Sequence, residues 1–306
     1  MADESDLSFL WLHPALAVVL NVEHDHPENY AGLDAHLDAY ARFADGIVPC
    51  GTLVISADDT GAAELTGRLR TSRPDLTIIT YGAVPGADWH ITEITASGMS
   101  SRAAVTTPAG QQVTVNLPVP GRHMAHNAVA ALAVAVHAGA DAAAAALALS
   151  SYRGIRGRLT EHGGTPGGVL VLDSFAHHPT AISADLEAAR TLAGDTGQVI
   201  AVFQPCGYTR TIAQAPGMAA ALKAADMTVL LDIHASVGEP VPGVSARLIA
   251  DAGTGELASR PYDAVHYVAE AACPGDVVLV MGTGDDLDLL AERICAALGA
   301  LHLAYR

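Results

Sequence analysis

Short apolar runs that end abruptly in polar residues recur along this chain of 306 residues. Each run has the length of a buried strand, and several are followed by a stretch whose apolar side chains repeat at helical spacing. Strands that alternate with helices form parallel sheets, because a parallel connection needs a crossover segment. The sequence therefore predicts an α/β fold with strands in residues 15–20, 51–56, 77–81, 169–172, 199–203, 227–233 and 276–281.

The pattern changes between the two groups of strands. Three segments between residues 89 and 117 alternate apolar and polar side chains with period two, which predicts a small antiparallel meander with one solvated face. Two helices are expected after it, and the basic, glycine-rich residues 152–158 then form a joint. We predict two domains: residues 1–151, with a parallel sheet and the meander, and residues 152–306, with a Rossmann-like sheet.

Composition narrows the classes of partner. A formal net charge of −17 argues against a nucleic acid or an anionic membrane surface as the ligand. The four cysteines are scattered and form no CxxC pair, so neither a disulfide framework nor a zinc knuckle is indicated, and a reducing cytoplasm is expected. The acidic beginning lacks the basic region of a secretory signal, and its longest apolar run is too short to span a bilayer.

Two of the predicted strands end in clusters of acids and histidines. His24, Asp25 and His26 follow the first strand, and residues 173–180 hold Asp173, His177 and His178 before a helix. Loops and helix N-termini with unpaired backbone donors converge at the carboxyl ends of parallel strands, so ligands bind there. A solvated loop is the alternative for a single histidine, but several titratable groups together favour a functional site.

Five segments together resemble the Mur ligases, most closely the branch that joins L-alanine to UDP-N-acetylmuramate. They match, in order, the family patterns EADESD, N-I-E-x-D-H, PGxHNxxN, D-D-Y-x-H-H-P-T and F-Q-P-H-R-Y-T-R-T. Five motifs in one order are far more specific than any one alone, and the resemblance covers essentially the whole chain. The segments are residues 2–6, 21–26, 120–127, 173–180 and 203–211.

The resemblance implies an amide-forming reaction in which ATP phosphorylates a substrate carboxylate and an amine then attacks the acyl phosphate. Metal ions and basic groups offset the charge crowded at the phosphates of such a reaction. By this resemblance His26 holds Mg²⁺, with His24 and Asp25 as neighbouring candidate ligands. His123 and Asn127 lie near the adenine and Arg158 near the nucleotide phosphates. The implied catalytic residues are Asp173, His177, His178 and Arg210.

The chain also departs from the family pattern. The resemblance implies a chain that begins inside the central domain, without the N-terminal UDP-sugar domain and without the G-x-x-x-x-G-K-[ST] loop that cradles phosphates. Met1 occupies the position of a metal-binding glutamate, Met124 replaces an adenine-side asparagine, and Cys206-Gly207 replaces His-Arg. The use of ATP stays open for this reason. A sheet cut through its middle also exposes an edge strand, so we expect either a homodimer or a separate subunit that carries the phosphate loop.

Three hypotheses remain open from the sequence. The first is a Mur-ligase-like enzyme that joins a small-molecule carboxylate to an amine, in a specialised biosynthetic pathway and with a partner for ATP. The second is an ATP-independent, metal-assisted enzyme, in which histidines, Asp25 and Cys206 hold Zn²⁺ or another transition metal in place of Mg²⁺. The third is a non-catalytic subunit that binds a nucleotide, a substrate or a protein.

Overall fold

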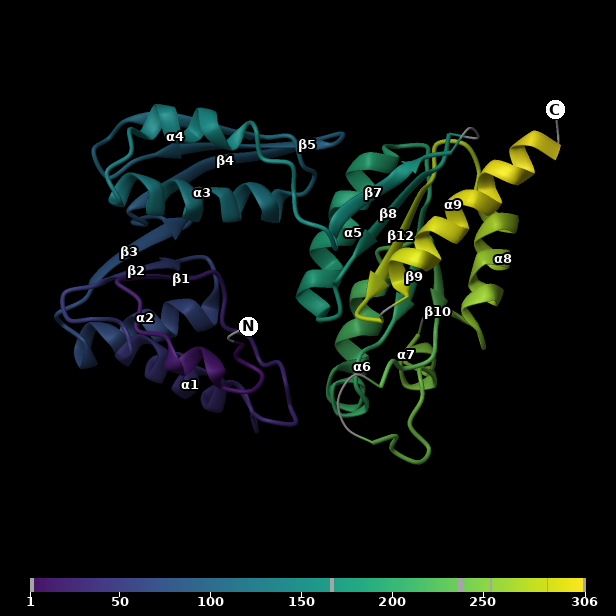
Figure 1. The fold of residues 1–306 in the computed structure, drawn as a ribbon, viewed down its shortest axis with the longest axis horizontal. Coiled ribbons are helices and arrows are strands. Elements are labelled where there is room, and N and C mark those ends of the chain that lie inside the picture. The colour runs from purple at the N-terminus through teal and green to yellow at the C-terminus, as the bar shows by residue number, and fades with distance from the viewer. Residues whose placement is uncertain (1–2, 166–167, 236–238, 254, 285, 305–306) are drawn as a thin grey trace. The chain divides into compact units, whose positions relative to one another are not determined.

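The computed structural model describes residues 3–304 except 166–167, 236–238, 254 and 285. The chain divides into two compact units, residues 1–96 with 100–152 and residues 97–99 with 153–306. Among the described residues each unit is built on a six-stranded sheet with helices packed against it (Figure 1). This confirms the predicted α/β fold, with a parallel sheet and a meander followed by a Rossmann-like sheet.

Unit 1 contains a sheet in the order β1-β2-β3-β4-β5-β6. The strands from β1 to β4 pair in parallel, and β5 pairs with β6 in antiparallel register, as expected for the meander. The elements of this unit are η1 (Ser8–Trp11), β1 (Leu16–Val19), α1 (Leu33–Asp45), β2 (Thr52–Ser56), α2 (Thr60–Ser72), β3 (Thr77–Gly82), β4 (Trp89–Ser97), β5 (Ser100–Thr106), β6 (Gln112–Leu117), α3 (Arg122–His137) and α4 (Ala142–Leu149).

Strand β2 shows why the sheet of unit 1 has helices on both faces. All five of its residues are buried. Leu53 and Ile55 point into one core, with buried residues of α1 and α2, while Val54 points into the other, with buried residues of α3. A strand buried on both faces reads as a continuous apolar run, which is how β2 appears in the sequence.

Unit 2 contains a sheet in the order β11-β10-β9-β12-β8-β7. All neighbours pair in parallel except β7, which is antiparallel to β8. Helices α5 and α6 cover one face and α8 and α9 the other (Figure 1). The elements are β7 (Arg158–Gly164), β8 (Leu170–Ser174), α5 (Pro179–Ala193), β9 (Val199–Gln204), α6 (Tyr208–Leu222), β10 (Met227–Leu230), α7 (Arg247–Asp251), β11 (Glu256–Leu257), α8 (Pro261–Ala271), β12 (Val277–Gly282) and α9 (Leu287–Ala304).

Two segments of unit 2 differ from the prediction. The joint was predicted to include Arg158, but Arg158 is already the first residue of β7. Strand β7 was not predicted, since register shifts against β8 break the alternation that would mark it. The polar segment after β9 was expected to be a loop, but α6 begins inside it at Tyr208.

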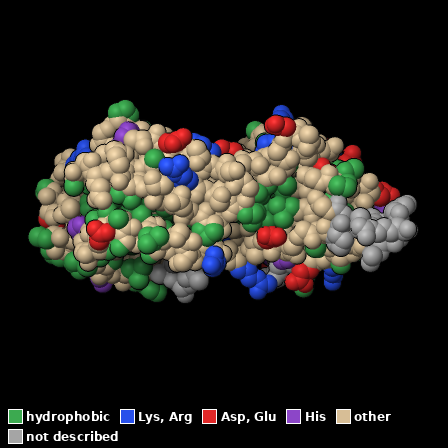
Figure 2. Space-filling view, turned by 90° about the horizontal axis from the view of Figure 1, so that it is seen from above, with side chains coloured by type: hydrophobic (Ala, Val, Ile, Leu, Met, Phe, Trp, Pro, Cys, Tyr) green, Lys and Arg blue, Asp and Glu red, His purple; other side chains and the backbone are tan. Residues whose placement is uncertain are grey.

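Two general features of the described residues are the distribution of their basic side chains and the apolar character of their helices. Among the described residues on the face shown in Figure 2, Lys and Arg side chains are scattered and do not gather into one patch. None of the helices within the described residues has the length and apolar character that crossing a bilayer requires.

Candidate functional site

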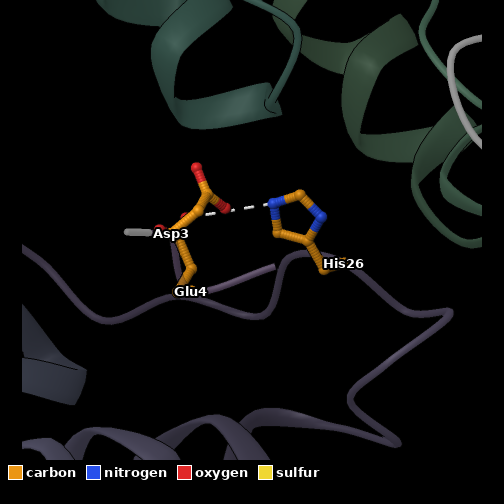
Figure 3. Close-up of side chains that lie close together, drawn as sticks. All are labelled: Asp3, Glu4 and His26. Carbon is orange, nitrogen blue, oxygen red and sulfur yellow. Dashed lines mark ion pairs between the residues drawn. The ribbon is translucent and has the colours of Figure 1, made fainter. Parts of the chain in front are cut away.

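The loop after β1 brings three potential metal ligands together. Asp3, Glu4 and His26 each offer one ligand atom, and these atoms lie within 4.8 Å of one another. The imidazole of His26 faces the acidic side chains of the N-terminal segment, with its Nε2 atom 3.9 Å from Oε1 of Glu4 (Figure 3). Two carboxylates and one imidazole suit a divalent cation, because Mg²⁺ is commonly held by one or two carboxylates and completes its shell with water.

The backbone around His26 is fixed by a tight turn. His26 has a φ of 50°, a conformation that costs energy for a residue with a side chain and that is concentrated at functional sites. Its amide nitrogen donates to Oδ1 of Asp25 at 2.8 Å, and its Nδ1 atom lies 3.1 Å from Oε1 of Glu28. These contacts orient the ring so that Nε2 faces the acidic segment.

Hydrogen bonds favour the ionised form of the Asp3 carboxyl. The bonds from Ser5 hold the pKa of the Asp3 carboxyl below its ordinary value, and they outweigh burial, which acts in the opposite direction. The amide of Ser5 donates to Oδ1 of Asp3 at 2.8 Å. A carboxylate that stays charged at neutral pH is the form that binds a cation.

The other two predicted metal ligands are placed differently. Nε2 of His24 lies 3.0 Å from the backbone oxygen of Tyr30, so this nitrogen is a donor and not a lone-pair ligand. Asp25 lies beside His26, with 3.8 Å between its Oδ2 atom and Nε2. The structure therefore does not bring His24 into the group of Asp3, Glu4 and His26, and the roles of His24 and Asp25 stay predictions. Met1 lies outside the described residues.

The N-terminus of α3 carries the two residues predicted to lie near a nucleotide base. His123 and Asn127 are four positions apart, so they lie on the same face of the helix. Gly121 precedes the helix with a φ of 97°, and a Cβ atom there would lie 2.6 Å from the His123 ring. Glycine is favoured at this position by its backbone conformation, and a larger residue would also require the His123 imidazole to shift.

A histidine–aspartate pair that the sequence reasoning missed links α3 to the ends of β2 and β3. Nε2 of His126 lies 3.0 Å from Oδ2 of Asp58, which follows β2. Asp58 also accepts hydrogen bonds from the amides of Ala83 and Val84, after β3. Burial would raise the pKa of the Asp58 carboxyl, but these bonds together hold it below its ordinary value.

The end of β8 holds the catalytic residues predicted in unit 2. Asp173 is buried at the end of the strand. His177 follows, with its Nδ1 atom 2.8 Å from the backbone oxygen of Phe175, and His178 caps α5 by accepting the amide of Thr180 at 3.4 Å. The guanidinium of Arg158 lies 5.9 Å from the centre of the Phe175 ring, so β7 brings this cation to the same loop.

Arg210 comes to the same edge of the sheet from another strand. It lies in the first turn of α6, directly after β9, and is 5% exposed. Strand β12 separates β9 from β8, so Arg210 and the residues after β8 occupy loops at the carboxyl ends of nearby parallel strands. The catalytic roles of these residues remain predictions.

Asp173 has a buried partner that the motifs did not reveal. Nε2 of His162, on β7, lies 3.4 Å from Oδ2 of Asp173, and both side chains are about nine-tenths buried. Within the described residues, neither this nitrogen nor Oδ1 of Asp173 makes a hydrogen bond. His162 is the extra residue at a register shift between β7 and β8, which breaks the alternation that might have signalled it.

Comparison with known proteins identifies the domains. Residues 1–135 match the family model of the Mur ligase middle domain, and residues 157–284 match that of the Mur ligase glutamate ligase domain. The UDP-N-acetylmuramate–L-alanine ligase of Streptomyces griseus is 45% identical over 295 residues, which cover 94% of this chain and 62% of the relative. The ligase of the same name from Thermobifida fusca is 42% identical, over 97% of this chain and 64% of the relative.

Solved structures show the same fold. The UDP-N-acetylmuramate–alanine ligase of Thermotoga maritima superimposes with a TM-score of 0.74 and 23% sequence identity, over 100% of this chain and 63% of that structure. The chain thus spans less than two thirds of the length of the relatives that it matches. On the family models and these relatives, the chain belongs to the Mur ligase family and contains its middle and C-terminal domains.

Proposed function

We propose that this chain carries the metal-, nucleotide- and amino-acid-binding parts of an ATP-dependent ligase that joins an amino acid to a carboxylate. The relatives are named for the ligation of L-alanine to UDP-N-acetylmuramate, and they support these two substrates for this chain. Their names do not favour the specialised pathway expected from the sequence. The chain spans only part of each relative, so the activity is a proposal for the protein to which these residues belong.

The observation that carries the proposal is the group of Asp3, Glu4 and His26 at the end of β1. An ATP-dependent ligase must offset several negative charges on the phosphates, and the net charge of −17 makes this harder. These three residues would hold Mg²⁺, which supplies positive charge at the phosphoryl oxygens when bound. The geometry of the ligands fits a hard cation better than a transition metal, since two of the three are carboxylates.

Unit 2 supplies the cationic side chains that the reaction needs. Arg210 is nearly buried in the first turn of α6, where the helix dipole also favours an anion. Arg158 lies over the ring of Phe175 beside the loop that carries His177 and His178. We propose that the two arginines bind anionic groups of the nucleotide and the acid substrate, and that the histidines orient the reacting carboxylate.

The triphosphate needs a cradle that residues 1–306 do not contain. No G-x-x-x-x-G-K-[ST] segment occurs in them. The backbone amides and lysine of such a loop therefore have to come from polypeptide outside these residues. We propose that this polypeptide packs along the edge of unit 1 at β1, one of the two edge strands of the sheet in the described residues and the only one of the two that pairs in parallel.

The ATP-independent alternative has less support. Cys206 is one of its candidate metal ligands, together with histidines and Asp25. Among the residues that the structure describes, Cys206 joins no group of three metal-ligating side chains, whereas His26 joins one with two carboxylates. The donor set at His26 therefore favours Mg²⁺ and ATP.

The proposal is tested by phosphate release from Mg-ATP in the presence of UDP-N-acetylmuramate and L-alanine. The chain is assayed alone and mixed with the portion of the Streptomyces griseus ligase that it does not match. We expect release that requires both substrates and that His26→Ala abolishes. The matched control is His266→Ala on α8, an exposed residue paired with Glu270, which should leave the rate unchanged. No release from folded protein in any mixture would contradict the proposal.

A further inference from the structure

The carboxylate of Asp58 joins three segments that are far apart in the sequence. Its Oδ2 atom accepts from Nε2 of His126 at 3.0 Å and from the amide of Ala83 at 2.8 Å, and its Oδ1 atom accepts from the amide of Val84 at 2.9 Å. Both oxygens are thus used. The loop after β2, the loop after β3 and helix α3 meet at this one side chain.

The space around the pair is shaped to hold it. A Cβ atom on Gly82 would lie 2.5 Å from Oδ1 of Asp58, so only glycine lets the carboxylate approach the end of β3. The fully buried ring of Tyr81 lies against the His126 imidazole, with 4.9 Å between the ring centres. The imidazole is therefore held by a hydrogen bond at Nε2 and by an aromatic neighbour, and its rotamer is restricted.

His126 occupies the point of α3 at which such a contact has most effect. It follows His123 by three positions and immediately precedes Asn127, so its tether sets the rotation of the turn that carries both. The helix begins after Gly121, which offers no side-chain cap. Arg122 adds one further tether through the backbone oxygen of Ile94. The first turns of α3 are thus held by side chains that contact residues at the ends of β2 and β3 and within β4.

We propose that His126 is a positioning residue for the nucleotide: through Asp58 it fixes the first turns of α3, and with them His123 and Asn127. The inference rests on the proposed function, because the role of His123 and Asn127 beside the adenine belongs to it. His126 touches no reacting atom in this account. It acts by keeping two other side chains in the position that binds the base, which reduces the ordering that binding requires.

The test compares three variants of the chain, each mixed with the portion of the Streptomyces griseus ligase that the chain does not match. His126→Leu removes the donor and keeps a side chain of similar bulk, while His126→Gln keeps an amide nitrogen that can donate to Asp58. His137→Leu is the matched control at the other end of α3, where Nε2 of His137 lies 2.9 Å from Oγ1 of Thr52. Two quantities are measured: the Kd of Mg-ATP by calorimetric titration, and amide hydrogen exchange in residues 122–127.

We expect His126→Leu to raise the Kd of Mg-ATP about tenfold, the size of effect that the loss of one charge-assisted hydrogen bond produces. Exchange in residues 122–127 should accelerate by a similar factor. His126→Gln should restore most of both, and His137→Leu should change neither. Unchanged exchange in His126→Leu would overturn the inference whatever the nucleotide does.

The two proposals can fail separately. If the mixture with wild-type chain binds no Mg-ATP although exchange is sensitive to His126→Leu, the proposed function fails and His126 is a structural tether only, which overturns the inference about the nucleotide. If the wild type binds Mg-ATP and His126→Leu binds it equally well, the proposed function stands and the inference is overturned.

Discussion

Each unit of this chain has a histidine–aspartate pair beside the end of a parallel strand, and the two pairs differ in how well their atoms are satisfied. Asp58 and His126 in unit 1 are hydrogen-bonded at 3.0 Å, and backbone amides occupy the remaining capacity of the carboxylate. Asp173 and His162 in unit 2 lie 3.4 Å apart and are more deeply buried, with polar atoms that make no hydrogen bond among the described residues.

The difference suggests that the Asp58–His126 pair stabilises the fold, whereas the Asp173–His162 pair costs free energy of folding. A partly exposed carboxylate with three donors is stable as it stands, and removing one donor lets water replace it. A buried carboxylate with incomplete hydrogen bonding costs free energy, which natural proteins tolerate mainly at functional sites. This favours Asp173 as a functional residue and Asp58 as a positioning one. The predictions below test this difference, from the largest expected effect to the smallest.

The largest effect is expected when the buried pair loses one partner. His162→Leu leaves the Asp173 carboxylate without its polar partner in a buried position, and we expect the free energy of unfolding to fall by about 3 kcal/mol. The measurement is urea unfolding followed by circular dichroism. The double variant His162→Leu with Asp173→Asn removes the uncompensated charge and should recover most of the loss.

A loss below about 1 kcal/mol in His162→Leu would show that the pair carries no charge coupling. In that case the contrast between the two pairs would disappear, and the incomplete hydrogen bonding of Asp173 could no longer be used as an argument for its function.

A smaller effect is expected at the satisfied pair. Asp58→Ala removes three hydrogen bonds, but Ala83 and Val84 are exposed and water can replace the carboxylate there. We expect the free energy of unfolding to fall by about 1.5 kcal/mol at neutral pH. The same urea titration measures it, with Asp59→Ala as a comparison, because Asp59 caps α2 by accepting the amide of Ala62.

The loss at Asp58 should depend on pH in a defined direction. The pKa of this carboxyl is lower in the folded chain than its ordinary value of 3.8, so its contribution is complete above about pH 5 and disappears as the pH falls through the lowered folded value. The difference between wild type and Asp58→Ala should therefore shrink on acidification. A difference that grew toward low pH would contradict the hydrogen-bonding scheme.

The smallest effect is expected at Cys295, on the far side of the His162 backbone. Its Sγ atom lies 3.7 Å from the backbone oxygen of His162, and burial raises the pKa of the thiol, so it stays a neutral and weak donor. Cys295→Ala should lower the free energy of unfolding by about 1 kcal/mol or less. A loss as large as that of His162→Leu would mean that the position of β7, and not the ion pair, dominates the stability of this region.

Local patterns in the sequence predicted the clusters at strand ends but not the contacts between distant segments. The clusters around His26 and after Asp173 were found because acids and histidines stand directly behind apolar runs. Asp58 was recognised as the end of a strand, but its partner His126 lies 68 positions away, and no local pattern connects them. His162 was missed because the bulge in β7 destroys the alternation by which a strand is recognised.

Departures from the family pattern were harder to interpret from the sequence. Met1 occupies the position of a metal-binding glutamate of the family pattern, and the sequence does not show which other acid could face His26. The structure places Asp3 and Glu4, two and three positions later, within reach of His26. The turn of the segment decides which of several neighbouring acids faces the histidine. Here Ser8 sets that turn, because its hydroxyl accepts a hydrogen bond from the amide of Asp3 at 2.8 Å.

The most direct test of the account is a titration of Mn²⁺, a spectroscopic substitute for Mg²⁺, into the purified chain, followed by electron paramagnetic resonance. The account predicts one site per chain, an affinity about tenfold weaker in Glu4→Gln, and loss of the site in His26→Ala. Asp6→Asn is the control, since Asp6 lies in the same acidic segment but outside the group. Equal affinity in wild type and His26→Ala would contradict the metal site and, with it, the proposed ligase.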